Sequence, residues 1–557
     1  MLKNYEISDE SFSTAQLALK ELFLSQDEIP DVVKIHSQVH QKRILINGEL
    51  RKWDGPFHEV FSPILIADKE SNKIKNIQIG SYPLGTINET KEALDAAVYA
   101  FGGGRGEWPA MHIHDRIEHL NDFIVEMMKR KSEIVKLIVW EIGKTVTDAE
   151  KEFDRTIDYT NETIRAAKEL YNTSNAFTVT QHFIGQTKKL PHGVVLCMGP
   201  FNYPLNETFT TLIPALIMGN TILFKPPKHG TLLFEPLLDA FAKCFPKGVV
   251  NTVYGRGRDI VPTLMESGKI DVLALIGSSR VADSLKKMHP RSNRLKSVLG
   301  LDAKNAAIIL PDADLHQAVK ECIVGTLTFN GQRCTAIKVL FVDQEIVDEF
   351  NKLLVEALKD LKMGMPWQNG VTITPLAEPE KPSYLKECID DATSKGAEIL
   401  NLEDGGGAIY GTFVHPTALY PVNDQMKIYH EEQFGPVIPV VAFSSLAEPI
   451  EYVTNSRFGQ QVSIFSQDTD AVSVIIDTLA NQVGRINLNS QCQRGPDTFP
   501  FNGRKDSAEG TLSVDEALFA FSVDSVVVTK QTPENERLIR SILESGDSKR
   551  LTNRVLF

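Results

Sequence analysis

The sequence predicts an α/β protein with mainly parallel sheets and more than one domain. At 557 residues the chain is too long for one compact core. Apolar strands such as GVVLCMG (193–199), TILFKP (221–226) and DVLALIG (271–277) alternate with helical segments. This alternation is typical of a parallel sheet covered by helices. A second set of apolar strands lies between about residues 305 and 480, so we expect two α/β units.

The segments around these units have patterns of their own. Residues 1–44 are polar with helical periodicity, and RILINGELRKW predicts a hairpin that turns at Asn47-Gly48. Apolar residues recur at helical spacing from Arg116 to Asp154. FAFSVDSVVVTK (519–530) predicts a β-rich segment, and a charged, helical tail follows it.

The composition excludes several classes of function. A formal net charge of −13 opposes non-specific binding to nucleic acid or anionic lipid. Six cysteines without a CxxC pair argue against a zinc site or a disulfide framework. The acidic N-terminus does not resemble a signal peptide, and the most apolar stretch, 211–224, is too short and broken to span a bilayer. We expect a cytoplasmic protein with reduced thiols that binds no metal, nucleic acid or membrane.

The stretch FNGQRCTAI (329–337) places Cys334 directly after Arg333. A free cysteine is most often a small buried hydrophobe. A thiol held near a cation, however, has a lowered pKa and can act as a nucleophile. This stretch alone leaves both interpretations open.

Four other motifs stand where strands give way to helices or loops. Asn202 in MGPFNYP (198–204) is either a turn residue or an amide donor to a developing oxyanion. Lys225 in FKPPKHG ends a strand, where α/β sheets bind their ligands. IGSS (276–279) opens a helix whose backbone N–H groups could bind a phosphate. The GxG of YGRGRD (254–259) is a weak dinucleotide signal by itself.

The order of these motifs is more specific than any one of them. PFNYP, FKPP, IGSS, GQRC and EEQFGPV follow one another at spacings that resemble the aldehyde dehydrogenase superfamily, over about residues 45–530. FNYP, FKPP, NGQRCTA and QRGPDTFPF (493–501) resemble most closely the branch of NADP-dependent non-phosphorylating glyceraldehyde-3-phosphate dehydrogenases. The resemblance implies oxidation of glyceraldehyde 3-phosphate to 3-phosphoglycerate through a cysteine thiohemiacetal and a thioester.

The resemblance also implies roles for individual residues. Cys334 matches the nucleophile, and Asn202 with the Cys334 backbone N–H matches the oxyanion hole. The positions that match cofactor contacts are Pro200, Lys225, Lys228, Gly277, Ser278, Glu432 and Phe434. The positions that match the residues around the substrate phosphate are Arg155, Tyr203, Arg333 and Arg494.

A domain plan follows from the same resemblance. It implies a Rossmann-like cofactor-binding domain, an α/β catalytic domain and a β-rich arm through which subunits form a homodimer or homotetramer. The expected boundaries are an N-terminal extension 1–44, a cofactor domain 45–172 and 191–304, a catalytic domain 305–485, an arm 173–190 and 511–530, and a tail 531–557.

Gly300 departs from the superfamily pattern. It stands in LGLDAKNAAIIL (299–310), where the superfamily has the glutamate that acts as general base. Without it, Asp302 or Glu432 could activate water, or the acyl group could leave to coenzyme A as in acylating semialdehyde dehydrogenases. The third alternative is a weakly active or non-catalytic relative with a binding role.

Lys228 is the second departure. Many relatives that prefer NAD carry an acidic residue at this position, three residues after Lys225. A cation there favours the 2′-phosphate of NADP, although NAD remains possible and a solvent-facing lysine is an equally good interpretation.

Overall fold

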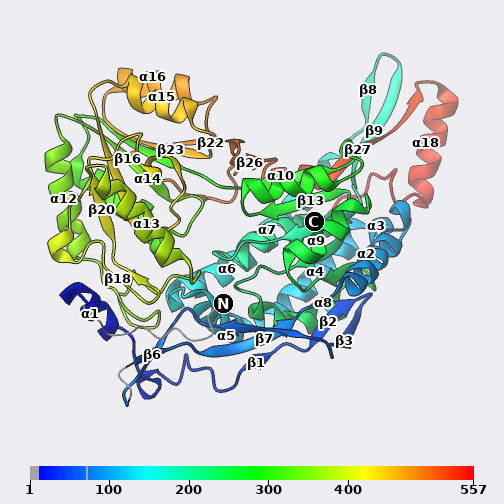
Figure 1. The fold of residues 1–557 in the computed structure, drawn as a ribbon. Helices are drawn as coiled ribbons and strands as arrows, with labels where there is room; N and C mark the ends of the chain where they lie inside the picture. Colours follow the sequence, from blue (N-terminus) through cyan, green and yellow to red (C-terminus); the bar gives the residue numbers. More distant parts are fainter. Residues whose placement is uncertain (1–11, 71–72, 557) are drawn as a thin grey trace.

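The computed structural model describes residues 12–70 and 73–556. Figure 1 shows two α/β units beside each other, with the N-terminal strands running below both and a β-arm at the far end of the first unit. No helix in the described ranges is long and apolar enough to cross a membrane.

The N-terminal part forms small sheets that support both units. A three-stranded sheet has the order β1-β7-β4, and β2 pairs with β3 in the predicted hairpin. Asn47 and Gly48 have φ values of 54° and 75°, the left-handed conformation that a two-residue hairpin turn requires. The elements are α1 (Thr14–Glu21), β1 (Val39–His40), β2 (Arg43–Ile46), β3 (Glu49–Lys52), β4 (Phe57–Phe61), β5 (Ile66–Asp68), β6 (Lys73–Lys75) and β7 (Gln78–Pro83).

The first α/β unit contains a six-stranded sheet with the order β12-β11-β10-β13-β14-β26. Its first five strands are parallel, and β26 closes the edge in the antiparallel sense. The strands are β10 (Val194–Met198), β11 (Thr221–Lys225), β12 (Val250–Thr252), β13 (Val272–Ile276), β14 (Lys296–Gly300) and β26 (Ala508–Glu509). The main helices are α2 (Ile87–Phe101), α4 (Ile113–Met128), α5 (Lys131–Ile142), α6 (Val146–Thr173), α7 (Asn206–Ile217), α8 (Leu238–Cys244), α9 (Gly257–Glu266) and α10 (Ser279–Met288).

The order of these strands reverses between β10 and β13. The chain runs outward from β10 through β11 to β12, and then returns to β13 on the other side of β10. Ligands of open α/β sheets bind outside the carboxyl ends of the strands at such a reversal. The loops after β10 and β13 are therefore placed to bind a ligand.

The second α/β unit contains a seven-stranded sheet with the order β17-β20-β21-β16-β15-β23-β24. All its pairs are parallel except β17 with β20. The strands are β15 (Asn305–Ile309), β16 (Ile337–Asp343), β17 (Glu398–Ile399), β20 (Thr417–Tyr420), β21 (Val437–Phe443), β23 (Gln461–Phe465) and β24 (Arg485–Leu488). The helices are α11 (Leu315–Leu327), α12 (Val347–Lys359), α13 (Lys381–Ser394), α14 (Lys427–His430), α15 (Ala447–Asn455) and α16 (Thr469–Leu479).

The arm is a three-stranded antiparallel sheet with the order β27-β9-β8. Its strands are β8 (Thr178–Thr180), β9 (Phe183–Pro191) and β27 (Ser522–Lys530). In the chain, β27 follows α17 (Val514–Ala520) and precedes α18 (Pro533–Ser545). The predicted strand over 519–530 is wrong at its start, because Phe519 and Ala520 belong to α17. Val514, Ala517 and Leu518 are buried at helical spacing, which explains the helix.

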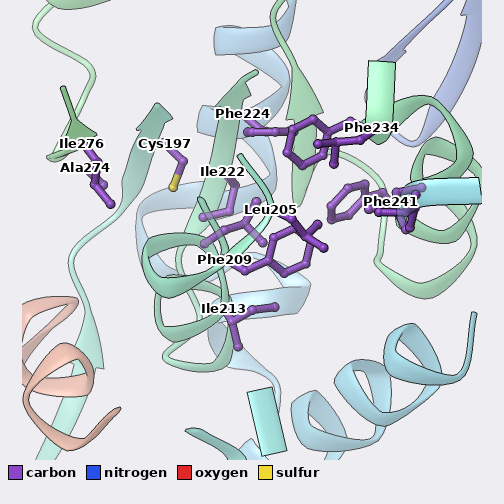
Figure 2. Packing of buried hydrophobic residues seen from close by; sticks show 14 of the residues in the cluster. Cys197, Leu205, Phe209, Ile213, Ile222, Phe224, Phe234, Phe241, Ala274 and Ile276 are labelled. Atoms are coloured by element: carbon purple, nitrogen blue, oxygen red, sulfur yellow. The ribbon is translucent and has the colours of Figure 1, made fainter. Parts of the chain in front are cut away.

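The centre of the first unit is apolar and rich in aromatic side chains. Every residue of α7 is buried, so this helix lies in the interior of the unit. Figure 2 shows Phe209 of α7 facing the aromatic cluster of Phe224, Phe234 and Phe241. The Phe224 and Phe234 rings meet edge to face at 4.7 Å. This packing fixes the start of α7, where the PFNYP motif enters the helix.

Candidate active site

Cys334 lines a cavity of about 860 Å³ whose walls come from both α/β units. The first unit contributes the loops after β10, β13 and β14, and the second contributes the cysteine loop and the segment around Glu432. The cavity thus collects the predicted nucleophile, oxyanion donor and base position. Of the residues predicted from sequence it is lined by Arg155, Pro200, Asn202, Tyr203, Gly277, Ser278, Gly300, Arg333, Cys334, Glu432, Phe434 and Arg494.

An unusual turn carries the cysteine. Phe329, Asn330 and Gly331 all have positive φ, at 50°, 56° and 71°. A Cβ on Gly331 would stand 2.6 Å from the Thr326 carbonyl oxygen, so only glycine fits there. Asn305 at the start of β15 then donates from Nδ2 to the Cys334 carbonyl at 2.8 Å. The turn and this hydrogen bond fix the direction in which the thiol points.

A buried ion pair holds the loop that carries Asn202. Lys144 Nζ lies 2.5 Å from Glu152 Oε2, and both side chains are 0% exposed. Lys144 also donates to the Asn202 carbonyl at 2.8 Å, and its ammonium lies 3.5 Å from the centre of the Tyr203 ring. Glu152 Oε1 accepts from the backbone N–H groups of Leu205 and Asn206. One lysine and one glutamate therefore bind both ends of the FNYP turn.

The Asn202 side chain bridges to the cysteine loop. Its Nδ2 donates to the Gln332 carbonyl at 2.8 Å. This hydrogen bond brings the Asn202 amide to the segment that contains Cys334, as an oxyanion hole made of both residues requires. The cysteine loop and the PFNYP loop thus meet at this hydrogen bond, and the oxyanion hole itself stays a prediction.

The electrostatic surroundings of Cys334 differ from the simplest expectation. Burial, together with the Glu207 and Glu432 carboxylates, raises the pKa of its thiol to about 11. Arg494 is the cation that opposes this shift in pKa. Arg333 instead donates to the carbonyls of Val324 and Gly325 at 3.1 and 2.9 Å. The neighbouring arginine therefore does not activate the thiol.

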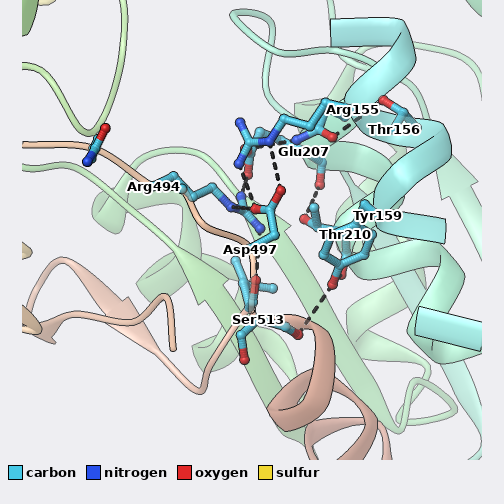
Figure 3. Close-up of polar contacts among 12 residues, drawn as sticks. Arg155, Thr156, Tyr159, Glu207, Thr210, Arg494, Asp497 and Ser513 are labelled. Carbon is cyan, nitrogen blue, oxygen red and sulfur yellow. Dashed lines mark hydrogen bonds and ion pairs between the residues drawn. The ribbon is translucent and has the colours of Figure 1, made fainter. Parts of the chain in front are cut away.

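Two of the predicted phosphate-binding arginines are paired with carboxylates, as Figure 3 shows. Arg155 makes two hydrogen bonds with Asp497, at 2.8 and 2.6 Å. Arg494 pairs with Glu207 and lies 3.3 Å from Asp497. Burial alone would raise the pKa of Asp497, but its contacts with the two arginines lower it. The four side chains together carry no net charge.

Two carboxylates, those of Asp302 and Glu432, line the same cavity as Gly300, the position of the absent base. A Cβ on Gly300 would make only ordinary contacts, the nearest at 3.4 Å from Leu512, and Gly300 does not have a positive φ. Asp302 Oδ2 accepts from the backbone N–H and the hydroxyl of Ser279, each at 2.8 Å. Glu432 Oε1 accepts no hydrogen bond and lies 3.6 Å from Lys338 Nζ. Burial raises the pKa of Glu432 to about 7 although Lys338 opposes this shift.

The predicted cofactor residues fall into two groups. Lys225 and Lys228 line a separate cavity of about 480 Å³ that also contains Arg256 and Arg258. Burial lowers the pKa of Lys225 to about 8, while Lys228 is 61% exposed. A basic cavity of this kind fits the adenosine ribose and 2′-phosphate of NADP. The other predicted contacts line the cavity of Cys334; they are Pro200, Gly277, Ser278, Glu432 and Phe434.

Comparison with known proteins identifies the family. A profile of the aldehyde dehydrogenase family matches residues 68–527. The chain belongs to this family. The recognition of the family and of its α/β fold is thereby confirmed, and with it membership of a group of NAD(P)-dependent dehydrogenases.

The relatives include several enzymes named for one reaction. The chain is 31% identical to the NADP-dependent glyceraldehyde-3-phosphate dehydrogenase of Streptococcus equinus over 82% of this chain and 93% of that protein. It is 28% identical to a lactaldehyde dehydrogenase of Methanococcus aeolicus over 82% and 96% of the two chains. The NADP complex of the NADP-dependent glyceraldehyde-3-phosphate dehydrogenase of Bacillus halodurans superposes with a TM-score of 0.79, at 31% identity over 88% of this chain and all of that one.

Several charged residues of the site were not singled out from the sequence. These are Lys144, Glu152, Glu207 and Asp497. Glu207 had a recognisable signal, because it follows PFNYP in a helix that is otherwise apolar or weakly polar. Asp497 and its partner Arg155 are 342 residues apart, so this pairing became visible only in three dimensions. Lys144 and Glu152 are only eight residues apart, but the sequence pattern does not show that both are buried.

Lys144→Met is expected to lower kcat more than it raises KM, because it releases the Asn202 carbonyl and loosens the oxyanion donor. Leaving Glu152 buried and unpaired should also cost about 3–5 kcal/mol of stability. The double variant Lys144→Met with Glu152→Gln is the matched control, since it removes both charges. It should regain stability in thermal unfolding without regaining kcat. A single variant with unchanged kcat would contradict the positioning role.

Proposed function

We propose that the chain oxidises an aldehyde to a carboxylic acid with NADP⁺ through a covalent intermediate on Cys334. The observation that carries this proposal is that Cys334 and Asn202 line one cavity between the two α/β units and are joined through Gln332. Bound NADP⁺ supplies the hydride acceptor. The basic cavity around Lys228 and Arg256 supports NADP over NAD, as do the relatives whose names specify NADP.

The reaction divides among residues of this chain. The Cys334 sulfur, after losing its proton, adds to the aldehyde carbonyl carbon, and the Asn202 amide donates to the oxygen that becomes negative. Loss of a hydride from the same carbon leaves a thioester. Water then attacks this carbon, the C–S bond breaks, and the acid leaves while the sulfur regains a proton.

Glu432 is the carboxylate that we propose as the base for the attacking water. Its pKa of about 7 suits a group that must take a proton near neutral pH, and its Oε1 accepts no hydrogen bond. The carboxylate of Asp302 is already bound to Ser279, which makes it the weaker candidate. Two alternatives to hydrolysis are transfer of the acyl group to coenzyme A and a non-catalytic role. Identification of the acyl product distinguishes among the three.

Glyceraldehyde 3-phosphate is the first candidate substrate. The name of the Streptococcus relative and the presence of Arg155, Tyr203 and Arg494 at the cavity support it. The pairing of both arginines with Asp497 and Glu207 favours a second candidate, an unphosphorylated hydroxyaldehyde. A lactaldehyde dehydrogenase among the relatives is consistent with that alternative.

We also propose a homo-oligomer in the cytoplasm. The arm strand β27 exposes Val523, Val526, Val527 and Val528. A row of exposed valines on an arm supports burial against another subunit. The six free cysteines are consistent with a reducing compartment.

Cys334→Ala is expected to abolish aldehyde oxidation while leaving NADP⁺ binding nearly unchanged, because the thiol forms the covalent intermediate. Steady-state NADPH formation and calorimetric titration with NADP⁺ measure the two effects. Cys197→Ala is the matched control, since this cysteine is buried in β10 away from the cavity lining. An alanine variant at 334 that kept most of its turnover would exclude the mechanism.

Arg494→Ala is expected to reduce kcat/KM for glyceraldehyde 3-phosphate about 10- to 150-fold, the equivalent of about 1.5–3 kcal/mol for a charged hydrogen bond. The loss with unphosphorylated glyceraldehyde should be much smaller. Glu207→Gln should act in the opposite direction, because it frees Arg494 for the phosphate. A wild-type enzyme that prefers glyceraldehyde or lactaldehyde over the phosphate ester would overturn the phosphorylated substrate and support the second candidate.

Glu432→Gln is expected to make deacylation limiting, so that a burst of NADPH near one per site precedes a slow steady state. In the wild type the carboxylate must be ionised, so deacylation should increase as the pH rises through about 7 and then level off. The variant should lose this limb of the profile.

Gly300→Glu in the Glu432→Gln background tests the same assignment in the other direction. It restores a carboxylate where the family has one, and the backbone at Gly300 accepts a side chain. We expect the steady-state rate to recover partly. Glu431→Gln, a neighbouring carboxylate bonded to the Tyr384 hydroxyl, is the control. If Glu432→Gln shows neither a burst nor a changed pH profile, another group is the base.

A further inference from the structure

Asp302 lies in the loop that follows strand β14, and its carboxylate is bound to the beginning of helix α10. Oδ2 accepts from the Ser279 backbone N–H and from the Ser279 hydroxyl, each at 2.8 Å. Ser507 donates to the Asp302 carbonyl at 2.8 Å, which holds the loop in place. The carboxylate therefore has a defined position on the first turn of α10.

This first turn of α10 is also where the fold presents donors to a phosphate. The helix follows β13, one of the two strands at which the order of the sheet reverses. Its N-cap residue, Ser278, makes no hydrogen bond with the helix through its side chain, and Ser278 lines the cavity of Cys334. A helix N-terminus at such a point is suited to the phosphates of a dinucleotide.

Asp302 lines that same cavity, together with Ser278 and Arg280. A negatively charged side chain thus uses, within the protein, the donors that a phosphate of the cofactor would use. The effect of Asp302 also reaches further into the site, because its charge raises the pKa of Glu432. At the other end of the cofactor path Lys225, Lys228 and Arg256 line the basic cavity, and the carboxylate nearest to Lys228, that of Glu380, is 70% exposed and 3.9 Å away.

We propose that Asp302 is an internal competitor for the pyrophosphate of the nicotinamide dinucleotide, and that it sets how weakly the chain holds its cofactor. This inference rests on the proposed use of NADP⁺. Binding of the dinucleotide then requires the carboxylate to give up Ser279, so that the intrinsic affinity of the site is reduced. The same exchange speeds release of NADPH, because Asp302 returns to α10 as the phosphates leave.

The test compares a whole cofactor with a fragment that lacks the pyrophosphate. Calorimetry on the full chain measures the Kd of NADP⁺ and of adenosine 2′-monophosphate for wild type, Asp302→Asn and Asp302→Gly. Both variants should bind NADP⁺ about tenfold more tightly or better, the range of one charged hydrogen bond recovered by the ligand. The affinity for the monophosphate, which reaches only the basic cavity, should not change.

Asp314→Asn is the matched control, because Asp314 caps α11 by accepting from Gln317 N and does not line the cavity. It should lose a similar amount of helix stability with no change in the Kd of NADP⁺. Unchanged binding of the monophosphate also reports that the Asp302 variants are folded.

Two results would overturn the inference. One is equal affinity of wild type and both Asp302 variants for NADP⁺, which leaves the proposed oxidation intact. The other is equal tightening of NADP⁺ and the monophosphate, which would place the effect away from the pyrophosphate. If no form of the chain binds NADP⁺ or NAD⁺, the proposed function fails together with the inference, and that outcome is distinct from the first two.

Discussion

The buried ion pair between Lys144 and Glu152 is the interaction on which the active-site geometry depends. Both charges are removed from water, so each must be satisfied by partners inside the protein. Those partners are the Asn202 carbonyl and the N–H groups of Leu205 and Asn206. These hydrogen bonds offset the free-energy cost of burying the two charges, and at the same time they fix the FNYP turn. A turn held only by its own hydrogen bonds would not keep the Asn202 amide against the cysteine loop.

Parallel sheets supply the rest of the arrangement. In the first unit the carboxyl ends of β10, β13 and β14 bring Asn202, Ser278 and Gly300 to one side of the sheet. The second unit contributes Cys334 from a loop before β16 and Glu432 from a loop before β21. Because each unit supplies only part of the chemistry, the site exists only where the two units meet. This explains why the cavity contains residues from 155 to 495.

The sequence was sufficient for the local parts of this arrangement. The strands at GVVLCMG, TILFKP and DVLALIG are confirmed as β10, β11 and β13, because unbroken apolar runs between turns leave little choice of structure. The order of the motifs was sufficient to predict the family, and it indicated that Cys334 and Asn202 belong to one site; both line the same cavity. The β-rich composition of 519–530 was misleading at Phe519 and Ala520, where the helical spacing of buried residues in α17 outweighs it.

Pairing over long distances in sequence was not predictable. Arg494 and Glu207 are 287 residues apart, and Arg155 and Asp497 are 342 apart. Each arginine matched the phosphate-binding pattern by type and position, and only the structure shows that a carboxylate stands beside it. The same is true of the thiol: the sequence places Arg333 next to Cys334, but the guanidinium points to the carbonyls of α11.

Carboxylates neutralise or occupy the donors at two of the places where an anion is expected. At the substrate end Asp497 and Glu207 neutralise Arg155 and Arg494, and at the cofactor end Asp302 is bound to α10. Under the proposed function, an anion that binds at either of these two places replaces an internal carboxylate instead of meeting unpaired donors. This replacement conserves the number of hydrogen bonds but moves a carboxylate of the protein into less favourable surroundings. The net free energy of binding the anion is therefore small. In a chain with a net charge of −13, such exchange limits the binding of anions that lack the correct geometry. The choice among anionic ligands then depends on which of them displaces these carboxylates. For this reason Glu207 and Asp302 contribute to ligand selectivity as much as the Arg494 and Ser279 side chains that they bind.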